Sequence, residues 1–411
     1  MTLGRILLQR SSGTTRERVG ARGLFLTLLM LLPALPAAAA PYRPTDDAQV
    51  LEYLPTARDA SLRELRRMHA ELARAPSDLA LALRVASADA DAGRAQADPR
   101  YNGYAEAALG PWIALPSPPP AVLVLRATLR QSRHDFAGAM TDLNEALAAD
   151  PRNAQARLTR AVILQVQGAY KEALGNCLSL ALYAAPLVTE TCIASVRSVH
   201  GMAASSRAML EAALASPRPG DNQEIRVWAL TVLAETDARL SDGEAAERHF
   251  QAALSLGLRD TYLLGAYADF LLDAGRAQEV RSLLRDETRI DPLLLRLALA
   301  EQALGASTLE GHIADLRERF AANRQRGDTS HQREEARFAL YLLKDPKEAL
   351  RLAQANWAQQ REPWDVRILL EAALAAGAPE AARPALDWLA TAHLEDAQVQ
   401  ALVAKLGRAA S

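Results

Sequence analysis

The sequence predicts an all-α fold, an α-solenoid built from stacked antiparallel helix pairs. Residues recur at an interval of 34 between Pro120 and Pro186. Within each copy, apolar residues lie three or four positions apart, which is the spacing of an amphipathic helix. The chain is also rich in Ala and Leu and shows no strand pattern. A period of this size without strand signals indicates helical hairpins stacked in a row.

Each of the two clear copies contains a pair of predicted helices, 121–132 and 136–149 in the first copy. Ala127 and Ala139 are small where the two helices must approach closely, and Phe136 is bulky beside the turn. Small residues opposite a large one set the angle between the two helices of the pair. The matching positions are Ala127 and Ala161, Gln131 and Gln165, Phe136 and Tyr170, Ala139 and Ala173, and Leu143 and Cys177.

The second copy resembles the tetratricopeptide repeat (TPR). The residues that carry the resemblance are Gly168, Tyr170, Ala173, Leu180 and Pro186. The first copy departs from the pattern, because Asp135-Phe136 replaces the Gly-x-Tyr pair and Leu123 replaces a Trp. The resemblance, to TPR proteins of the exported bacterial type, implies a TPR-like superhelix that binds a protein or peptide on its concave face.

The N-terminus is typical of a secretory signal. Residues 1–39 combine five Arg with an apolar run at 24–35 and a short Ala-rich end, which predicts cleavage and a periplasmic or secreted protein. The run is too short for a confident membrane span, and no Cys follows it for lipid attachment. Cleavage would leave 42 basic and 48 acidic residues, a net charge of −6, without a basic cluster. This charge argues against nucleic acid or an anionic membrane as the partner.

The remaining chain divides into four predicted regions. An extended segment without helical period, 40–57, precedes divergent N-terminal helical repeats at 58–119, which the proline run before Ala121 closes. A TPR array occupies 120–292, with an inserted loop near 216–223, after which the 34-residue spacing resumes. Residues 293–411 continue as degenerate helical repeats and end in a capping helix with a polar outer face.

No catalytic motif stands out. The sequence lacks phosphate-binding, zinc-protease and serine-hydrolase signatures, and its seven His are scattered, so neither a metal nor a small-molecule cofactor is predicted. His331 with Glu334 and Glu335 is the one local cluster of His and carboxylates, which we interpret as a solvated helix start. The alternative is an envelope enzyme whose site is built from isolated His, Glu and Asp in the C-terminal half.

The predicted binding surface is the concave face, which the first helix of each pair lines. The predicted partner-binding residues are Gln131, Gln165, Trp228, Glu235, Tyr262 and Asp269. Trp228 and Tyr262 occupy matching places on successive repeats and are the predicted aromatic anchors, unless they are core residues. The family's carboxylate-gripping Lys, Asn and Arg are not matched, since Val124, Thr128, Leu158 and Val162 hold the corresponding places.

The chain's two cysteines are predicted to form a disulfide. Cys177 and Cys192 lie on antiparallel helices, and the midpoint between them falls beside the turn that joins the helices, so they lie at nearly equal height. An exported chain also meets an oxidising compartment. The alternative is a pair of buried free thiols.

Overall fold

The computed structural model describes residue 46 and residues 60–409, apart from 97, 217 and 219. The predicted signal at 1–39 and nearly all of the extended segment at 40–57 lie outside the described residues. The chain divides into two units, Met1–Arg58 and Asp59–Ser411, and every helix below belongs to the second. The described residues contain no strand, and none of their helices is long and apolar enough to cross a membrane.

Three helices open the second unit: α2 (Ala60–Arg74), α3 (Leu79–Gln96) and α4 (Arg100–Ile113). Val85, Ala105 and Leu109 are fully buried between α3 and α4. Helix α3 continues past Gly93 to Gln96. Gly93 is buried and lets α4 approach closely, because a Cβ at this position would lie only 3.2 Å from the Cβ of Tyr101 on α4.

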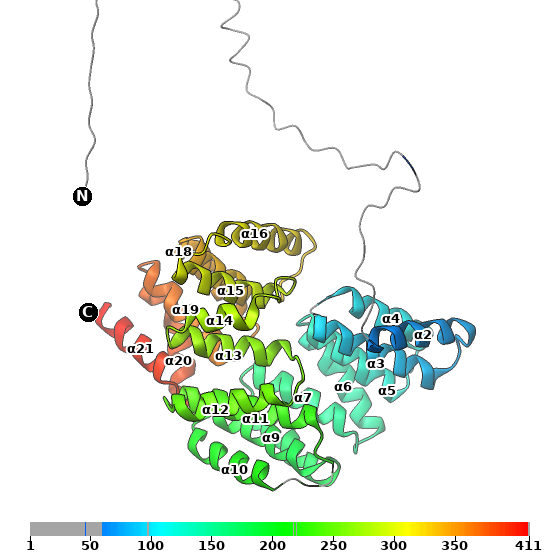
Figure 1. Ribbon diagram of the computed structural model, residues 1–411. Coiled ribbons are helices and arrows are strands. Elements are labelled where there is room, and N and C mark those ends of the chain that lie inside the picture. Colours follow the sequence, from blue (N-terminus) through cyan, green and yellow to red (C-terminus); the bar gives the residue numbers. More distant parts are fainter. Residues whose placement is uncertain (1–45, 47–59, 97, 217, 219, 410–411) are drawn as a thin grey trace, which may run out of the picture. The chain divides into compact units, whose positions relative to one another are not determined.

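Three regular helix pairs follow (Figure 1): α5 (Pro120–Ser132) with α6 (Phe136–Ala149), α7 (Ala154–Val166) with α8 (Tyr170–Ser179) and the short η2 (Leu180–Leu182), and α9 (Pro186–Ser198) with α10 (Ala203–Ala215). Ala127 and Ala139 are fully buried and Phe136 is 5% exposed, which confirms the predicted alternation of small and large residues. The side chains of Asp135 and Asn153 cap α6 and α7 by accepting hydrogen bonds from backbone amides.

After a loop at 216–222, the pairing resumes with α11 (Gln223–Arg239) and α12 (Gly243–Ser255), then α13 (Thr261–Asp273) and α14 (Ala277–Leu284). Asn222, Asp242 and Asp260 cap three of these helices. The loop covers the predicted insertion, and an apolar core centred on Phe250 and Leu264 fills the space between the pairs.

The C-terminal helices are shorter and less regular. They are α15 (Asp291–Leu304), α16 (Leu309–Gln325), α17 (Gln332–Arg337) with a π-helical turn η3 (Phe338–Leu342), α18 (Pro346–Trp357), α19 (Pro363–Ala375), η4 (Pro379–Ala382), α20 (Arg383–Ala392) and α21 (Ala397–Ala409). The region is helical throughout, as the sequence predicted, and α21 keeps Gln398, Gln400 and Lys405 exposed, as a capping helix should.

These C-terminal helices pack back onto the middle repeats. A single apolar core contains Ala161, Tyr170 and Val196 together with Trp357 and Leu369. Backbone contacts at two turns fix the arrangement. The turn after α7 is held by Arg361, whose amide donates to the Val166 carbonyl at 2.7 Å, and the start of α10 is held by Glu395, whose carboxylate accepts from the Ala203 amide at 2.6 Å.

The two cysteines lie inside this shared core. The structure joins Cys177 on α8 to Cys192 on α9, in agreement with the sequence prediction, and their Cα atoms lie 5.4 Å apart. Both residues are buried. The disulfide therefore staples the second clear repeat to the third, directly beneath the C-terminal helices.

Candidate binding groove

A groove with a volume of about 1780 Å³ runs through the second unit, and we call it the inner groove. Its lining includes residues of the first helices α5, α7, α11 and α13, as the solenoid geometry predicts. All six predicted partner-binding residues line it: Gln131, Gln165, Trp228, Glu235, Tyr262 and Asp269. The structure thus brings these side chains to one surface, while their role in binding stays a prediction.

The opposite wall was not predicted from the sequence. It is formed by residues of the C-terminal helices, including Arg333, Glu362, Trp364 and Arg367. The Glu362-Pro363-Trp364 sequence marks the start of α19 correctly, because Pro is suited to a first helical turn. It does not reveal which repeat the helix faces, and this depends on packing between residues far apart in the chain.

Trp228 is less accessible than an interface anchor was expected to be. Its side chain is partly buried and packs against two apolar cores, the one shared with the C-terminal helices and a second formed by α9, α10 and α11. Only part of the indole is open to the inner groove. The alternative that Trp228 contributes to the core therefore holds for most of this side chain.

Tyr262 and Glu235 form a pair on the groove wall. Tyr262 is 58% exposed, and its hydroxyl donates to the Glu235 carboxylate at 2.9 Å. Burial between the groove walls raises the pKa of Glu235 to about 7, and Arg239 only partly offsets this effect. Burial and the neighbouring Glu235 carboxylate also raise the pKa of Tyr262. The pair thus combines an accessible aromatic ring with a carboxylate whose burial is only partly offset by the positive charge of Arg239.

Asp269 has a different role from the one predicted. It is only 4% exposed, and its carboxylate accepts hydrogen bonds from Arg296 at 2.6 Å and from Arg337 at 2.7 Å. Burial alone would raise the pKa of Asp269, but the two guanidinium groups lower it below its usual value. Helical register correctly predicted that Asp269 faces inward, but Arg296 and Arg337 cover its carboxylate. Asp269 orders the groove wall and is not a free contact for a partner.

Trp364 is held by two arginines. The guanidinium carbons of Arg337 and Arg367 each lie 4.1 Å from the centroid of its ring, which is the range of cation–π attraction. Arg367 also makes a bidentate ion pair with Asp273 on α13, at 2.6 and 2.7 Å. These contacts attach α19 to α13 across the inner groove.

The cluster at the start of α17 is buried, which corrects the prediction of a solvated helix start. Glu334 is 6% exposed and Glu335 is 3% exposed. Glu335 pairs with Arg324, and Arg333 pairs with Glu334 at 3.3 Å. The local sequence predicts the helix start correctly but not its burial, which comes from packing against α18 and α19.

The other sequence-level candidates do not converge on a metal site. No group of three or more His, Cys, Asp or Glu residues in the described part of the chain could hold a metal ion. Three His residues instead pair singly with buried carboxylates, and these pairs are His69 with Asp89, His249 with Asp237, and His312 with Glu301. In each pair the His and the carboxylate lie on neighbouring helices.

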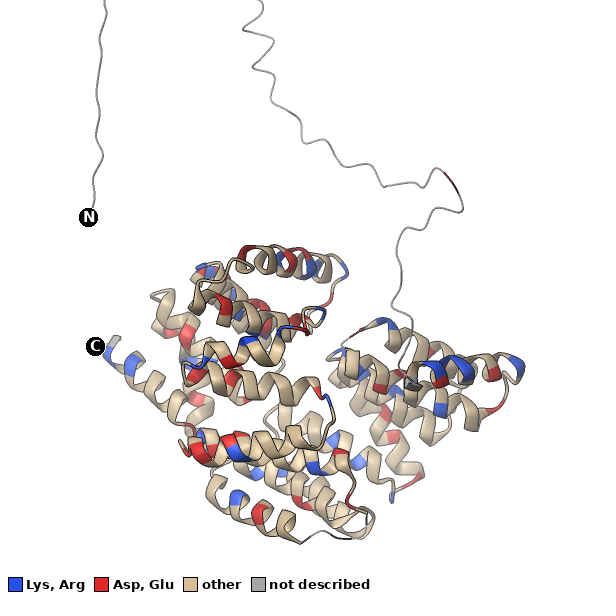
Figure 2. Ribbon diagram, viewed as in Figure 1, with Lys and Arg blue, Asp and Glu red and all other residues tan. Residues whose placement is uncertain are grey.

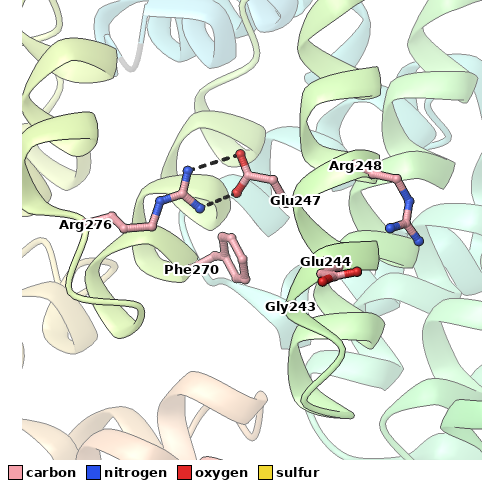
Figure 3. Close-up of a pocket in the computed structure, with 6 residues that line it drawn as sticks. All are labelled: Gly243, Glu244, Glu247, Arg248, Phe270 and Arg276. Atoms are coloured by element: carbon pink, nitrogen blue, oxygen red, sulfur yellow. Dashed lines mark hydrogen bonds and ion pairs between the residues drawn. The ribbon is translucent and has the colours of Figure 1, made fainter.

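A second depression, of about 660 Å³, lies beside α12 and α13 (Figure 3). Its apolar part is Phe270, and Arg276 points at Glu247 across it, at 2.6 Å. Glu247 also accepts hydrogen bonds from Tyr267 and Gln251. Arg276 and Glu247 are thus bonded to each other, and the depression is smaller than the inner groove, which makes it a weaker candidate.

The pairs α5–α6 and α7–α8 recur at the 34-residue interval, with the turn glycine Gly168 at φ +79° and the buried Tyr170 in the places that the repeat requires. The fold is of the tetratricopeptide type. In Figure 2, acidic and basic residues are both scattered over the helices, in keeping with the balanced composition.

No protein-family model and no curated protein matches the sequence. Among solved structures, the APC/C hetero-tetramer Cut9-Hcn1 is similar with 14% identity and a TM-score of 0.40, over 76% of this chain and 52% of that chain. This chain thus spans about half the length of that relative.

Two further similar structures are a tetratricopeptide repeat protein from Parabacteroides merdae and yeast Tom70. The first has 13% identity and a TM-score of 0.34, over 76% of this chain and 98% of that chain. The second has 10% identity and a TM-score of 0.22, over 86% and 96%. At such TM-scores the likenesses carry no argument of their own, and the assignment of the fold rests on the helix pairs of this chain.

Proposed function

We propose that the protein is a non-catalytic scaffold that binds an extended segment of a protein partner in the inner groove. The observation that carries this proposal is the size and lining of the groove. Small-molecule sites usually occupy about 300–1,000 Å³. The inner groove, at about 1780 Å³, exceeds that range and joins residues of at least four repeats to the C-terminal helices. Such a surface suits a chain that contacts several repeats in succession.

The chemistry of the groove wall also favours binding over catalysis. Candidate catalytic carboxylates of the C-terminal half form ion pairs with arginines. Glu362 pairs with Arg333, and Glu335 pairs with Arg324. A general acid or base must instead be free to reach a substrate proton. Tyr262 provides the kind of exposed aromatic ring that anchors protein interfaces.

The cell envelope is the proposed location. This part of the proposal rests on the Arg-rich start, the apolar run at 24–35 and the Ala-rich end of residues 1–39, which together favour export and cleavage. N-terminal sequencing of the mature protein tests it. A chain that retains Met1 in the cytoplasm would reject the proposed location without affecting the groove.

The binding role is tested by site-specific photocrosslinking in the native host. A photoreactive phenylalanine analogue replaces Tyr262 in one variant and Tyr104 on α4 in another. Both tyrosines are more than half exposed, but only Tyr262 lines the inner groove. We expect a discrete crosslinked partner at position 262, with a single mapped segment, and none of this species at position 104. The same products from both positions, or none from either, would contradict the proposal.

A further inference from the structure

Glu235 differs from Asp269 and Asp273, two carboxylates of α13 that line the same groove. Asp269 and Asp273 are each neutralised by arginine, through the ion pairs with Arg337 and Arg367. Glu235 makes no ion pair with any described residue, and its hydrogen-bond partner is the neutral hydroxyl of Tyr262, at 2.9 Å. A carboxylate that is partly buried and has no ion-pair partner is stabilised when a cation binds beside it.

Arg239 and Arg333 act electrostatically on this pair, but neither forms an ion pair with Glu235. Arg239 lies one turn from Glu235 on α11, but its guanidinium donates to the hydroxyls of Ser198 at 3.1 Å and Thr236 at 3.2 Å. Arg333 faces three carboxylates. These are Glu362 at 2.9 Å, Glu334 at 3.3 Å and Asp365 at 3.4 Å. The charge of Glu362 acts on both Glu235 and Tyr262 and raises the pKa of each, while Arg239 opposes this effect at Glu235 and Arg333 opposes it at Tyr262.

Tyr262 adds a surface that suits a cation. Its hydroxyl is fixed by Glu235, while 58% of the residue remains exposed. A cation that lies within about 6 Å of a tyrosine ring centroid is attracted by the ring face. A basic side chain over Tyr262 would therefore meet the ring face and the Glu235 carboxylate together.

We propose that Glu235 and Tyr262 form a pocket for one lysine or arginine side chain of the segment that occupies the inner groove. This inference rests on the proposed function and specifies the chemistry of its partner. Charge complementarity carries it, because the incoming cation would supply the ion pair that Glu235 lacks, while the aliphatic stem of the side chain would lie against the aromatic ring. The partner is thus expected to be basic at this position.

The test uses the mature chain and three fluorescent pools of short peptides. Each pool has one fixed central residue, lysine, glutamine or glutamate, between randomised neighbours. Binding is measured by fluorescence anisotropy at pH 8, where Glu235 carries its charge. We expect the lysine pool to bind about tenfold more tightly than the glutamine pool, and the glutamate pool to bind most weakly.

Two variants locate the effect. Glu235→Gln removes the charge but keeps a carbonyl that can accept the Tyr262 hydrogen bond, so the wall should stay folded. Glu310→Gln is the matched control on α16, because Glu310 is exposed and does not line the inner groove. We expect Glu235→Gln to abolish the preference for lysine and Glu310→Gln to leave it unchanged. Equal effects of the two variants would show that the net charge alone attracts the peptides, and would overturn the inference.

The outcomes also separate this inference from the proposed function. If the three pools bind with equal affinity and Tyr262→Ala weakens them all, the groove binds peptides but has no cation pocket. If no pool binds, or if the glutamate pool binds best, the inference is equally rejected. Photocrosslinking at position 262 then decides independently whether a protein occupies the groove.

Discussion

The repeats from α5 to α14 and the helices from α15 to α21 use their charged residues differently. In the repeats, ion pairs join the two helices of one hairpin or of neighbouring hairpins, as Asp142 on α6 does with Arg126 and Arg130 on α5. In the C-terminal part, arginines reach distant repeats. Arg337 contacts Asp269 across 68 residues of sequence, and Arg367 contacts Asp273 across 94. Regular repeats therefore stack by local packing, whereas buried ion pairs help place the irregular helices that complete the inner groove.

The most damaging change to this arrangement should be Arg337→Met. Arg337 is 2% exposed, and its loss would leave the buried Asp269 carboxylate with one guanidinium partner in place of two. Breaking a buried ion pair by removing one partner costs about 3–5 kcal/mol. Urea denaturation of the mature chain measures this loss. The control is Arg351→Met, whose exposed pair with Glu348 should contribute no more than about 1 kcal/mol. Equal losses in both variants would mean that the buried ion pair does not hold the two regions together.

Reduction of the disulfide should have the next largest effect. Cys177 and Cys192 are 15 residues apart, and a loop of that length corresponds to about 3 kcal/mol in the chain-entropy model. We expect the native protein to have a mass lower by two hydrogens than the reduced form and to lose thermal stability with reductant. The double variant Cys177→Ala, Cys192→Ala should not respond to reductant. Two alkylated thiols in protein taken from its own compartment would contradict the disulfide.

Two glycine substitutions probe the contact between the middle repeats and the C-terminal helices. Gly168 and Gly275 both have positive φ, so alanine costs about 1–2 kcal/mol of backbone strain at either position. A Cβ at Gly168 would also lie 3.2 Å from Nε1 of Trp388 on α20, whereas one at Gly275 would meet no atom within 4 Å. Gly168→Ala should therefore destabilise the protein by about 1 kcal/mol more than Gly275→Ala, because of overpacking. Equal melting temperatures would indicate that α20 does not pack against this turn.

The smallest predicted effect is a pH dependence that originates on the groove wall. The folded-state pKa of Glu235, about 7, lies above its ordinary value of 4.5, so the folded protein binds more protons between these values. Its contribution to stability is thus full below pH 4.5 and is lost as the pH rises toward 7. Glu235→Gln should reduce the loss of stability between pH 5 and pH 8 by on the order of 1 kcal/mol, after allowance for solvent in the groove. If the pH dependence of stability is unchanged in the variant, the pKa of Glu235 is not raised in the folded protein.

The sequence predicted local structure better than contacts between distant residues. The 34-residue interval of the two clear copies, the buried Ala127 and the bulky Phe136 beside the turn all depend on residues close together in the chain. The same helical register placed Glu235 and Tyr262 on the inner groove. These features could be predicted because each follows from helix geometry and from neighbours a few residues away.

The misassigned residues share one cause. Asp269 and Glu334 were each assigned correctly to a helix, but their burial depends on arginines and helices far along the chain. Trp364 likewise lies at the start of α19, and its place on the groove wall depends on Arg337 and Arg367, which pack against its ring. Periodicity carries no information about these contacts, because the C-terminal helices no longer follow the repeat interval that would fix their neighbours.

The central claim is that the inner groove, closed by the C-terminal helices, holds a protein segment. The most direct test is the affinity of the crosslinked segment, prepared as a synthetic peptide, for three forms of the mature chain in isothermal titration calorimetry. Tyr262→Ala should weaken binding by about tenfold or more, because it removes the exposed aromatic anchor, while Tyr104→Ala on α4 should leave the affinity within about twofold of the wild type. Circular dichroism should show that both variants remain folded. Equal affinity of all three forms would contradict the claim.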